Sequence, residues 1–246
     1  MSDWLQAWLE DFRKEAARQG FDEEVLGEIG GWPLLAHSRE VAGRPVVYCS
    51  AGMHGDEPAG VEALGELLRS GDCDDRFSWR LCPVLNPTGL ALGARENAAG
   101  VDLNRDYLKA ATEEVSLHRH WLDRLGAPAL FLSLHEDWES TGFYFYEIAL
   151  GEGESCYPGV RQAAERVMPM EPEALIDDHE TREPGWIFHP AVPDRMEEWP
   201  EAIYLAKQGC PLSFTLETPS SRPLGDRVRC HLEVARYLLD WFAERS

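Results

Sequence analysis

Two hydrophobic patterns alternate along most of this chain. Short apolar runs typical of buried strands occur at residues 45–50, 79–85, 129–134, 143–148 and 212–217. Segments whose apolar residues recur at helical spacing occur at residues 57–68, 113–125, 157–167, 196–207 and 222–244. Strands that alternate with helices in this way are typical of a sheet covered by helices on both faces. The pattern therefore predicts an α/β fold: a single-domain, three-layer α/β/α sandwich with a mixed, mostly parallel central sheet.

Smaller elements are predicted outside this alternation. Residues 1–20 are expected to form an N-terminal helix, because their large apolar residues recur at helical spacing. Strand-like runs follow at 24–29 and 32–38. Residues 168–199 are rich in Pro, Glu and Asp with little regular pattern, and are expected to form a long loop or lid. Because repeats and linkers are absent from the sequence, residues 1–246 are interpreted as one catalytic domain.

Charge and composition narrow the range of functions. The 246 residues include 44 acidic and 23 basic side chains, which gives a formal net charge of −21. This balance argues against nucleic acid and anionic membranes as partners. No stretch approaches the ~20 apolar residues of a membrane span, and the acidic N-terminus has no apolar secretory core. A cytoplasmic protein is therefore expected, and its six scattered cysteines are expected to be free thiols.

Residues that could form a metal site stand at the ends of three predicted strands: candidate ligands at two of them and a candidate base at the third. His54 and Glu57 lie where the strand at 45–50 runs into a helix, and His135 follows the strand at 129–134. Two imidazoles and one carboxylate are the ligand set of a catalytic zinc, which keeps a fourth position for water. Glu217 ends a third strand and is the candidate base for that water. We therefore expect one Zn²⁺ per chain, with the three ligand tips within ~5 Å of one another.

A glycine-rich segment, residues 86–107, carries a second group of polar side chains, among them Arg95, Asn104 and Arg105. A guanidinium group presents a fork of donors that matches a carboxylate. These side chains could therefore clamp an anionic substrate terminus or polarise a carbonyl oxygen. Taken alone, these side chains would be better explained by a surface loop of Asp–Arg salt bridges. A helix cap would explain Glu57 equally well.

Five motifs then occur in a fixed order: His54-Gly-Asp-Glu57, Asn86-Pro-x-Gly89, Gly100-Val-Asp-Leu-Asn-Arg105, a strand-end His135, and Thr215-Leu-Glu217. In this order they resemble the zinc carboxypeptidase superfamily over residues 45–217. Within it, the chain looks most like murein tripeptide amidases, which cleave γ-D-glutamyl–diaminopimelate bonds. It is also similar to the succinylglutamate desuccinylase/aspartoacylase branch.

The resemblance implies roles for the metal ligands and the base. His54, Glu57 and His135 would bind Zn²⁺, and Glu217 would act first as general base and then as general acid. Asp102 matches a family aspartate that accepts a hydrogen bond from a metal-bound histidine. This role agrees with the need of a ligand imidazole to have its second nitrogen oriented by an acceptor.

The resemblance also implies how substrate is held. Arg95 would polarise the scissile carbonyl, and Asn104 with Arg105 would hold the substrate carboxylate. Two features depart from the family pattern. The strand exit at residues 136–139 is unusually acidic, and the substrate-facing tyrosine of the family cannot be located by motif, the candidates being Tyr144, Tyr146 and Tyr204.

The expected function is that of a zinc-dependent metallocarboxypeptidase or peptide amidase, which hydrolyses an amide bond next to a free carboxylate in small peptides. An N-acyl amino acid deacylase is the alternative, and its substrate would be an acylated amino acid. The desuccinylase branch often carries an extra C-terminal β-domain, for which the final helix leaves no room, so the peptidase is favoured. A non-catalytic module that keeps its zinc would be expected to lack a ligand or the base, and this sequence keeps them all. The oligomeric state stays open.

Overall fold

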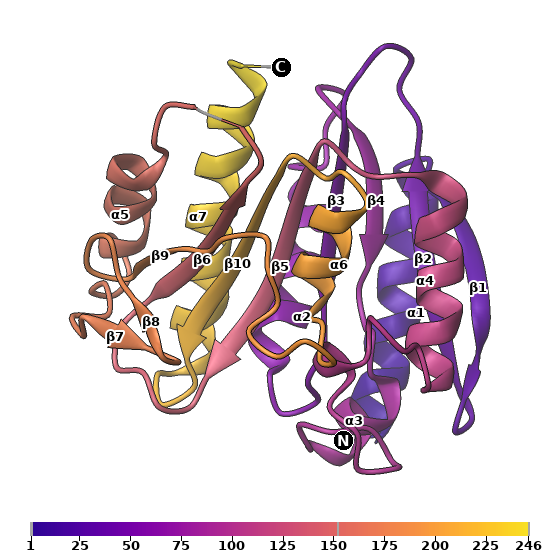
Figure 1. Cartoon of the computed structure of the whole chain (residues 1–246). Helices are drawn as coiled ribbons and strands as arrows, with labels where there is room; N and C mark the ends of the chain where they lie inside the picture. Colours follow the sequence, from indigo (N-terminus) through magenta and orange to yellow (C-terminus); the bar gives the residue numbers. More distant parts are fainter. Residues whose placement is uncertain (1, 152, 246) are drawn as a thin grey trace.

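The computed structural model describes residues 2–151 and 153–245. An eight-stranded sheet forms its centre (Figure 1). Its strands, in spatial order, are β1 (Asp22–Ile29), β2 (Trp32–Arg39), β4 (Ser78–Cys82), β3 (Val46–Ala51), β5 (Leu130–Asp137), β10 (Leu212–Pro219), β6 (Tyr144–Ala149) and β9 (Trp186–Phe188). A separate two-stranded hairpin joins β7 (Leu175–Ile176) to β8 (His179–Glu180).

The middle of the sheet is parallel and its flanks are mixed. β4, β3, β5 and β10 are neighbours with parallel pairing throughout. β2 and β1 add antiparallel strands on one side; on the other side β6 is antiparallel to β10, and β9 is parallel to β6. The predicted α/β fold with a mixed, mostly parallel sheet is confirmed.

Helices cover both faces of this sheet, which makes three layers (Figure 1). One face packs against α1 (Ser2–Arg18), α2 (Pro58–Arg69), α5 (Tyr157–Glu165) and α7 (Leu224–Ala243). The other face carries α4 (Glu113–Leu125) and α6 (Glu201–Lys207). The short helix α3 (Pro87–Leu92) and a single 3₁₀ turn (Leu103–Arg105) lie in the connection between β4 and α4.

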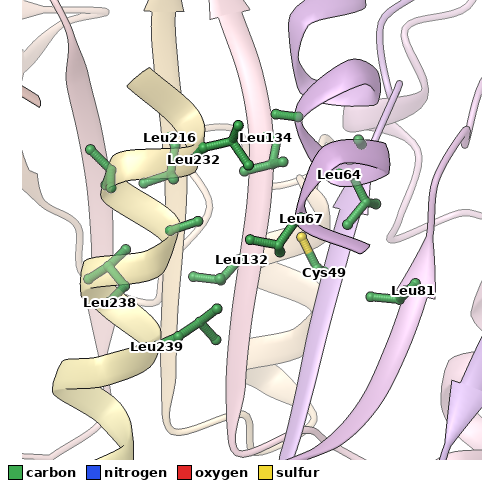
Figure 2. Close-up of a cluster of buried hydrophobic side chains, with 14 of the residues drawn as sticks. Cys49, Leu64, Leu67, Leu81, Leu132, Leu134, Leu216, Leu232, Leu238 and Leu239 are labelled. Atoms are coloured by element: carbon green, nitrogen blue, oxygen red, sulfur yellow. The ribbon is translucent and has the colours of Figure 1, made fainter. Parts of the chain in front are cut away.

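The larger core lies between the parallel strands and the α2–α7 layer. Leu132 and Leu134 of β5 and Leu216 of β10 point toward α2 and α7, whose leucines fill the space between the layers (Figure 2). All three strand leucines are almost fully buried, and each such side chain stabilises the fold by roughly 1.5–3 kcal/mol. The strands that carry His135 and Glu217 are therefore anchored in the main hydrophobic core.

The segment expected to be a glycine-rich loop contains a helix. The Asn86 side chain accepts a hydrogen bond from the Gly89 backbone N–H at 2.8 Å, Pro87 is the first helical residue, and Gly93 ends α3 in the left-handed conformation. An N-cap Asn, a Pro at the first position and a terminal Gly are a helix signature. The sequence analysis missed it because the helix is only six residues long.

The predicted lid, residues 168–199, is not entirely irregular. It contains the β7–β8 hairpin, and β9 extends the main sheet along β6. The helix expected at 196–207 begins at Glu201, because Pro200 immediately before it has an extended backbone conformation. Strands of two or three residues are too short to produce a recognisable periodicity.

Candidate active site

Three predicted metal ligands converge at the carboxyl edge of the parallel strands. The Nδ1 atom of His54 lies 2.6 Å from Glu57 Oε1, and the Nδ1 atom of His135 lies 2.9 Å from Glu57 Oε2. One potential ligand atom from each residue lies within 4.8 Å of the others. All three side chains are buried. The distance expected from the sequence is met, and the group has the composition of a three-ligand metal site that leaves a position open.

A tight turn between β3 and α2 brings His54 and Glu57 to this edge. Gly52 has a backbone φ of +63°, a conformation that residues other than glycine rarely adopt. At Gly55 a Cβ atom would overlap the backbone of Gly89 and Leu90, so the turn packs directly on α3. α3 therefore supports the turn that carries His54 and Glu57, although it contributes none of the candidate ligands itself.

A second set of contacts orients the ligands. The Nε2 atom of His54 lies 3.1 Å from Asp102 Oδ1, the arrangement expected of a residue that orients a ligand imidazole. Arg95 donates to Glu57 Oε1 at 3.3 Å and to Asp102 Oδ2 at 3.2 Å. The Asp102 side chain also accepts a hydrogen bond from the Asn104 backbone N–H, which begins the 3₁₀ turn. This turn thus links Asp102 to Asn104.

The charges of the three groups are strongly interdependent. Burial disfavours the ionised form of Glu57, but the two histidines attract it more strongly and lower its pKa. Burial also opposes the imidazolium of His54, yet Glu57 and Asp102 raise its pKa to about 9. For His135, burial prevails and lowers the pKa. A carboxylate held ionised between two imidazoles suits a divalent cation, which would take the place of the proton on His54.

Glu217 lies on the strand next to His135. In the parallel β5–β10 pair, Glu217 and His135 are direct Cα partners, so both side chains leave the sheet at the same level. Glu217 is partly buried. Burial, followed by repulsion from Glu57 and Asp137, raises the pKa of Glu217. A carboxyl group that holds a proton readily is suited to proton transfer near neutral pH.

All the predicted site residues line one cavity of about 780 Å³. They are His54, Glu57, Arg95, Asp102, Asn104, Arg105, His135 and Glu217. The Asn104 side-chain oxygen accepts a hydrogen bond from the Glu201 backbone N–H at 3.0 Å, which fixes the amide. Arg105 is exposed, and its guanidinium donates to the Asn104 backbone oxygen at 2.9 Å. The structure thus brings the eight residues together, and their individual roles stay predictions.

The acidic strand exit has a largely structural explanation. Glu136 is buried, accepts a hydrogen bond from the Ala59 backbone N–H at 2.6 Å, and forms an ion pair with Arg227. The Asp137 carboxylate accepts hydrogen bonds from the backbone N–H groups of Glu139 and Ser140, which closes the turn after β5. These groups secure the end of the strand that carries His135.

Two of the three candidate tyrosines line the cavity. Tyr144 is the direct partner of Glu217 and Tyr146 that of Thr215, because β6 pairs with β10. Tyr204 instead packs in the core between α4 and α6, where its hydroxyl donates to Asp123. The sequence analysis could not choose among them because the choice depends on which strand pairs with β10.

Comparisons with known proteins agree with this geometry. A family model for the succinylglutamate desuccinylase/aspartoacylase catalytic domain matches residues 44–147. Carboxypeptidase SOL1 of Arabidopsis thaliana is 28% identical over 43% of this chain and 25% of its own length. Murein peptide amidase A of Escherichia coli (strain K12) is 38% identical over 37% of each protein. The chain therefore spans well under half the length of these two relatives. Its resemblance to the zinc carboxypeptidase superfamily is confirmed.

A solved structure extends the likeness to nearly the whole chain. A protein from Shewanella amazonensis SB2B, assigned as a metallopeptidase, superposes with a TM-score of 0.84 at 25% identity, covering 96% of this chain and 92% of its own. These similar proteins are a carboxypeptidase, a peptide amidase and a metallopeptidase, and in this chain the His54–Glu57–His135 group could hold a metal ion. Within residues 2–151 and 153–245, no helix has the length and hydrophobicity needed to span a membrane.

Proposed function

We propose that this protein is a zinc-dependent peptidase or peptide amidase that cleaves an amide bond next to a free carboxylate in a small peptide. The observation that carries the proposal is the register of β5 and β10, which sets the candidate base Glu217 directly beside the ligand His135. A cavity of about 780 Å³ that opens onto this pair supports a small substrate.

Each residue of the candidate site would have its own role in the reaction. His54, Glu57 and His135 would hold Zn²⁺, which when bound activates water and polarises a carbonyl group. Glu217 would take a proton from the attacking water and pass it to the leaving amine. Arg95 would donate to the carbonyl oxygen as negative charge develops there, a contribution of roughly 3–4 kcal/mol for one well-placed donor.

Asn104 and Arg105 would anchor the carboxylate of the leaving group. Arg105 is exposed on the cavity rim, and the Asn104 side chain is oriented by the backbone of α6. Such an anchor would restrict cleavage to bonds near a carboxyl end, because the scissile bond would be positioned at a fixed distance from the anchored group.

A deacylase is the second candidate, because the family model that matches residues 44–147 is that of the desuccinylase/aspartoacylase catalytic domain. The same ligands and base would then cleave an N-acyl amino acid. The two reactions differ in their products. A deacylase releases the acyl group as a free carboxylic acid together with the amino acid, and a peptidase releases an amino acid or a shorter peptide.

A hydrolysis screen tests the proposal. Zinc-loaded protein is incubated with γ-glutamyl–diaminopimelate peptides, peptides with free C-termini and N-acyl amino acids, and the products are identified by mass spectrometry. We expect peptide cleavage at a carboxyl end. Glu217→Gln should keep its zinc and lose roughly 10²–10⁴-fold in turnover. Glu139→Gln is the matched control, because it removes an exposed carboxylate from the same cavity without touching the centre.

Each result has a distinct meaning. Release of free acyl groups would favour the deacylase. Stoichiometric zinc without any hydrolysis would favour a binding module. Wild-type turnover in Glu217→Gln would show that Glu217 is not the base, and an equal loss in Glu139→Gln would assign the effect to the general charge of the cavity.

A further inference from the structure

A second group of potential metal ligands also lines this cavity. His179, His189 and Asp194 each offer one ligand atom, and these atoms lie within 4.8 Å of one another. The two Nε2 atoms face one carboxylate: His179 is 3.4 Å from Asp194 Oδ2, and His189 is 3.3 Å from Asp194 Oδ1. The two imidazole ring centroids are 4.8 Å apart.

The backbone brings these residues together from different elements. His179 begins β8, directly after a two-residue turn in which Asp177 and Asp178 both have positive φ, at 48° and 64°. His189 follows β9, and its backbone N–H donates to the Glu147 carbonyl of β6 at 2.8 Å. Positive φ at both central residues is typical of the two-residue type I′ turns that join the strands of a hairpin. This turn presents His179 at the start of β8.

An aromatic side chain supports both imidazoles. The Tyr146 ring contacts His179 edge-on with centroids 5.7 Å apart, and it contacts His189 at 6.2 Å. Its hydroxyl donates to Asp177 at 2.8 Å, which ties the turn to β6. The group is thus built into the sheet edge through β6.

The Asp194 carboxylate has no basic counterpart. In the described part of the chain, its salt bridges are to the two histidines, and neither Lys nor Arg reaches it. The adjacent Arg195 pairs instead with Glu198 at 3.0 Å. Among the described residues that line the cavity, ten are acidic and three are arginines. The charge of the cavity lining as a whole therefore favours a cation.

His189 Nε2 and Asp194 Oδ1 lie within hydrogen-bonding distance of each other, at 3.3 Å. The same spacing is compatible with coordination of one ion. Two ligand atoms on a tetrahedral ion with bonds of ~2.1 Å lie about 3.4 Å apart, close to the 3.3 and 3.4 Å found here.

We propose that His179, His189 and Asp194 form a second site for a divalent transition metal such as Zn²⁺, separate from the His54–Glu57–His135 group. Two imidazoles and a carboxylate match the ligand preferences of this class of ion. The ion would join the β7–β8 hairpin to the segment after β9 and fix that wall of the cavity. The proposal does not depend on the reaction proposed above.

Metal stoichiometry tests this assignment. The full chain is stripped with a chelator, and Zn²⁺ binding is measured by isothermal titration and by metal analysis after dialysis. We expect two equivalents for the wild type and one for each of His179→Ala, Asp194→Asn and His54→Ala. His120→Ala, which removes an exposed histidine of α4, is the matched control and should keep two. Because Asp194 is exposed and Asn has nearly the same shape, Asp194→Asn should fold, and circular dichroism checks this.

The outcomes separate the two sites. One equivalent in the wild type with no change in Asp194→Asn would overturn the second site, and a substrate ammonium would then be the better occupant of this group. Two equivalents that persist in both His179→Ala and Asp194→Asn would also overturn it, by locating the second ion elsewhere. Hydrolysis in the screen above depends on His54 and is measured independently, so either proposal can fail alone.

Discussion

Replacing Glu201 with glutamine should remove a pH-dependent loss of stability that the native carboxyl group imposes. Glu201 is 1% exposed and lies at the start of α6, against β3. Its carboxylate accepts hydrogen bonds from Tyr48 Oη at 2.7 Å and from Ser50 Oγ at 2.9 Å. Burial raises the pKa of Glu201 from 4.5 to about 7, although these two hydrogen bonds oppose the increase.

The sign and size of the effect follow from this difference. Because the folded state binds the proton more tightly than the unfolded state, the stabilising contribution is fully present below pH 4.5 and is lost as the pH rises through about 7. The gap between the two pKa values corresponds to about 3 kcal/mol of unfolding free energy. Glutamine resembles the protonated acid: its oxygen can accept from Tyr48, and its amide can donate to Ser50. Glu201→Gln should therefore match the wild type near pH 4.5 and exceed it by up to about 3 kcal/mol at pH 8.

Urea unfolding followed by tryptophan fluorescence at several values between pH 4.5 and 8.5 measures this difference. Subtracting the wild type from the variant at each pH removes the contribution of every other titrating group. Tyr48→Phe is the control of opposite sign, because it deletes a donor that favours the ionised carboxylate and should enlarge the loss at pH 8. A free-energy difference between Glu201→Gln and the wild type that stays constant across this range would refute the reasoning.

Three further predictions concern the site and the core. Asp102→Asn should weaken metal binding at the His54 centre roughly 10–100-fold, measured by competition with a chelator, and an unchanged affinity would remove Asp102 from that role. Leu132→Ala should lower the free energy of unfolding by about 2–5 kcal/mol in chemical denaturation, and a loss below 1 kcal/mol would mean that the α2–α7 core can repack around the cavity. Arg227→Ala should lower the free energy of unfolding by roughly 3–5 kcal/mol, because the Glu136 carboxylate would be left buried without its ion pair. A small change in thermal denaturation would show that water reaches Glu136.

Much of the fold followed from local patterns. The helix at 113–125 was located from periodicity, because burial of one face imposes a fixed spacing on apolar residues. The strand that begins near residue 46 was located as a short continuous apolar run, because a central strand is buried on both faces. The convergence of His54 and His135 could be expected for a related reason: both follow strands of one parallel sheet, and the carboxyl ends of such strands meet at one edge.

What escaped prediction depends on contacts between distant segments. The insertion of β10 between β5 and β6 decides that Tyr144 and Tyr146 line the cavity, and nothing local in the sequence around either tyrosine specifies that order. The meeting of His179, His189 and Asp194 depends on the path of the chain after β9, which no local pattern specifies. Glu201 was not singled out, since its carboxyl group gains its partners only when α6 packs on β3.

Because β10 lies between β5 and β6, the central sheet can be completed only late in synthesis. The ribosome produces β5 and β6 more than sixty residues before β10, yet these two strands are not neighbours and each pairs with β10 in the finished sheet. Until the last fifth of the chain emerges, both therefore present unpaired edges, which are prone to association with other chains. The three residues of the His54 centre are synthesised well before Glu217. The candidate metal ligands are thus present in the nascent chain before the candidate base Glu217, which lies on the strand that completes the sheet.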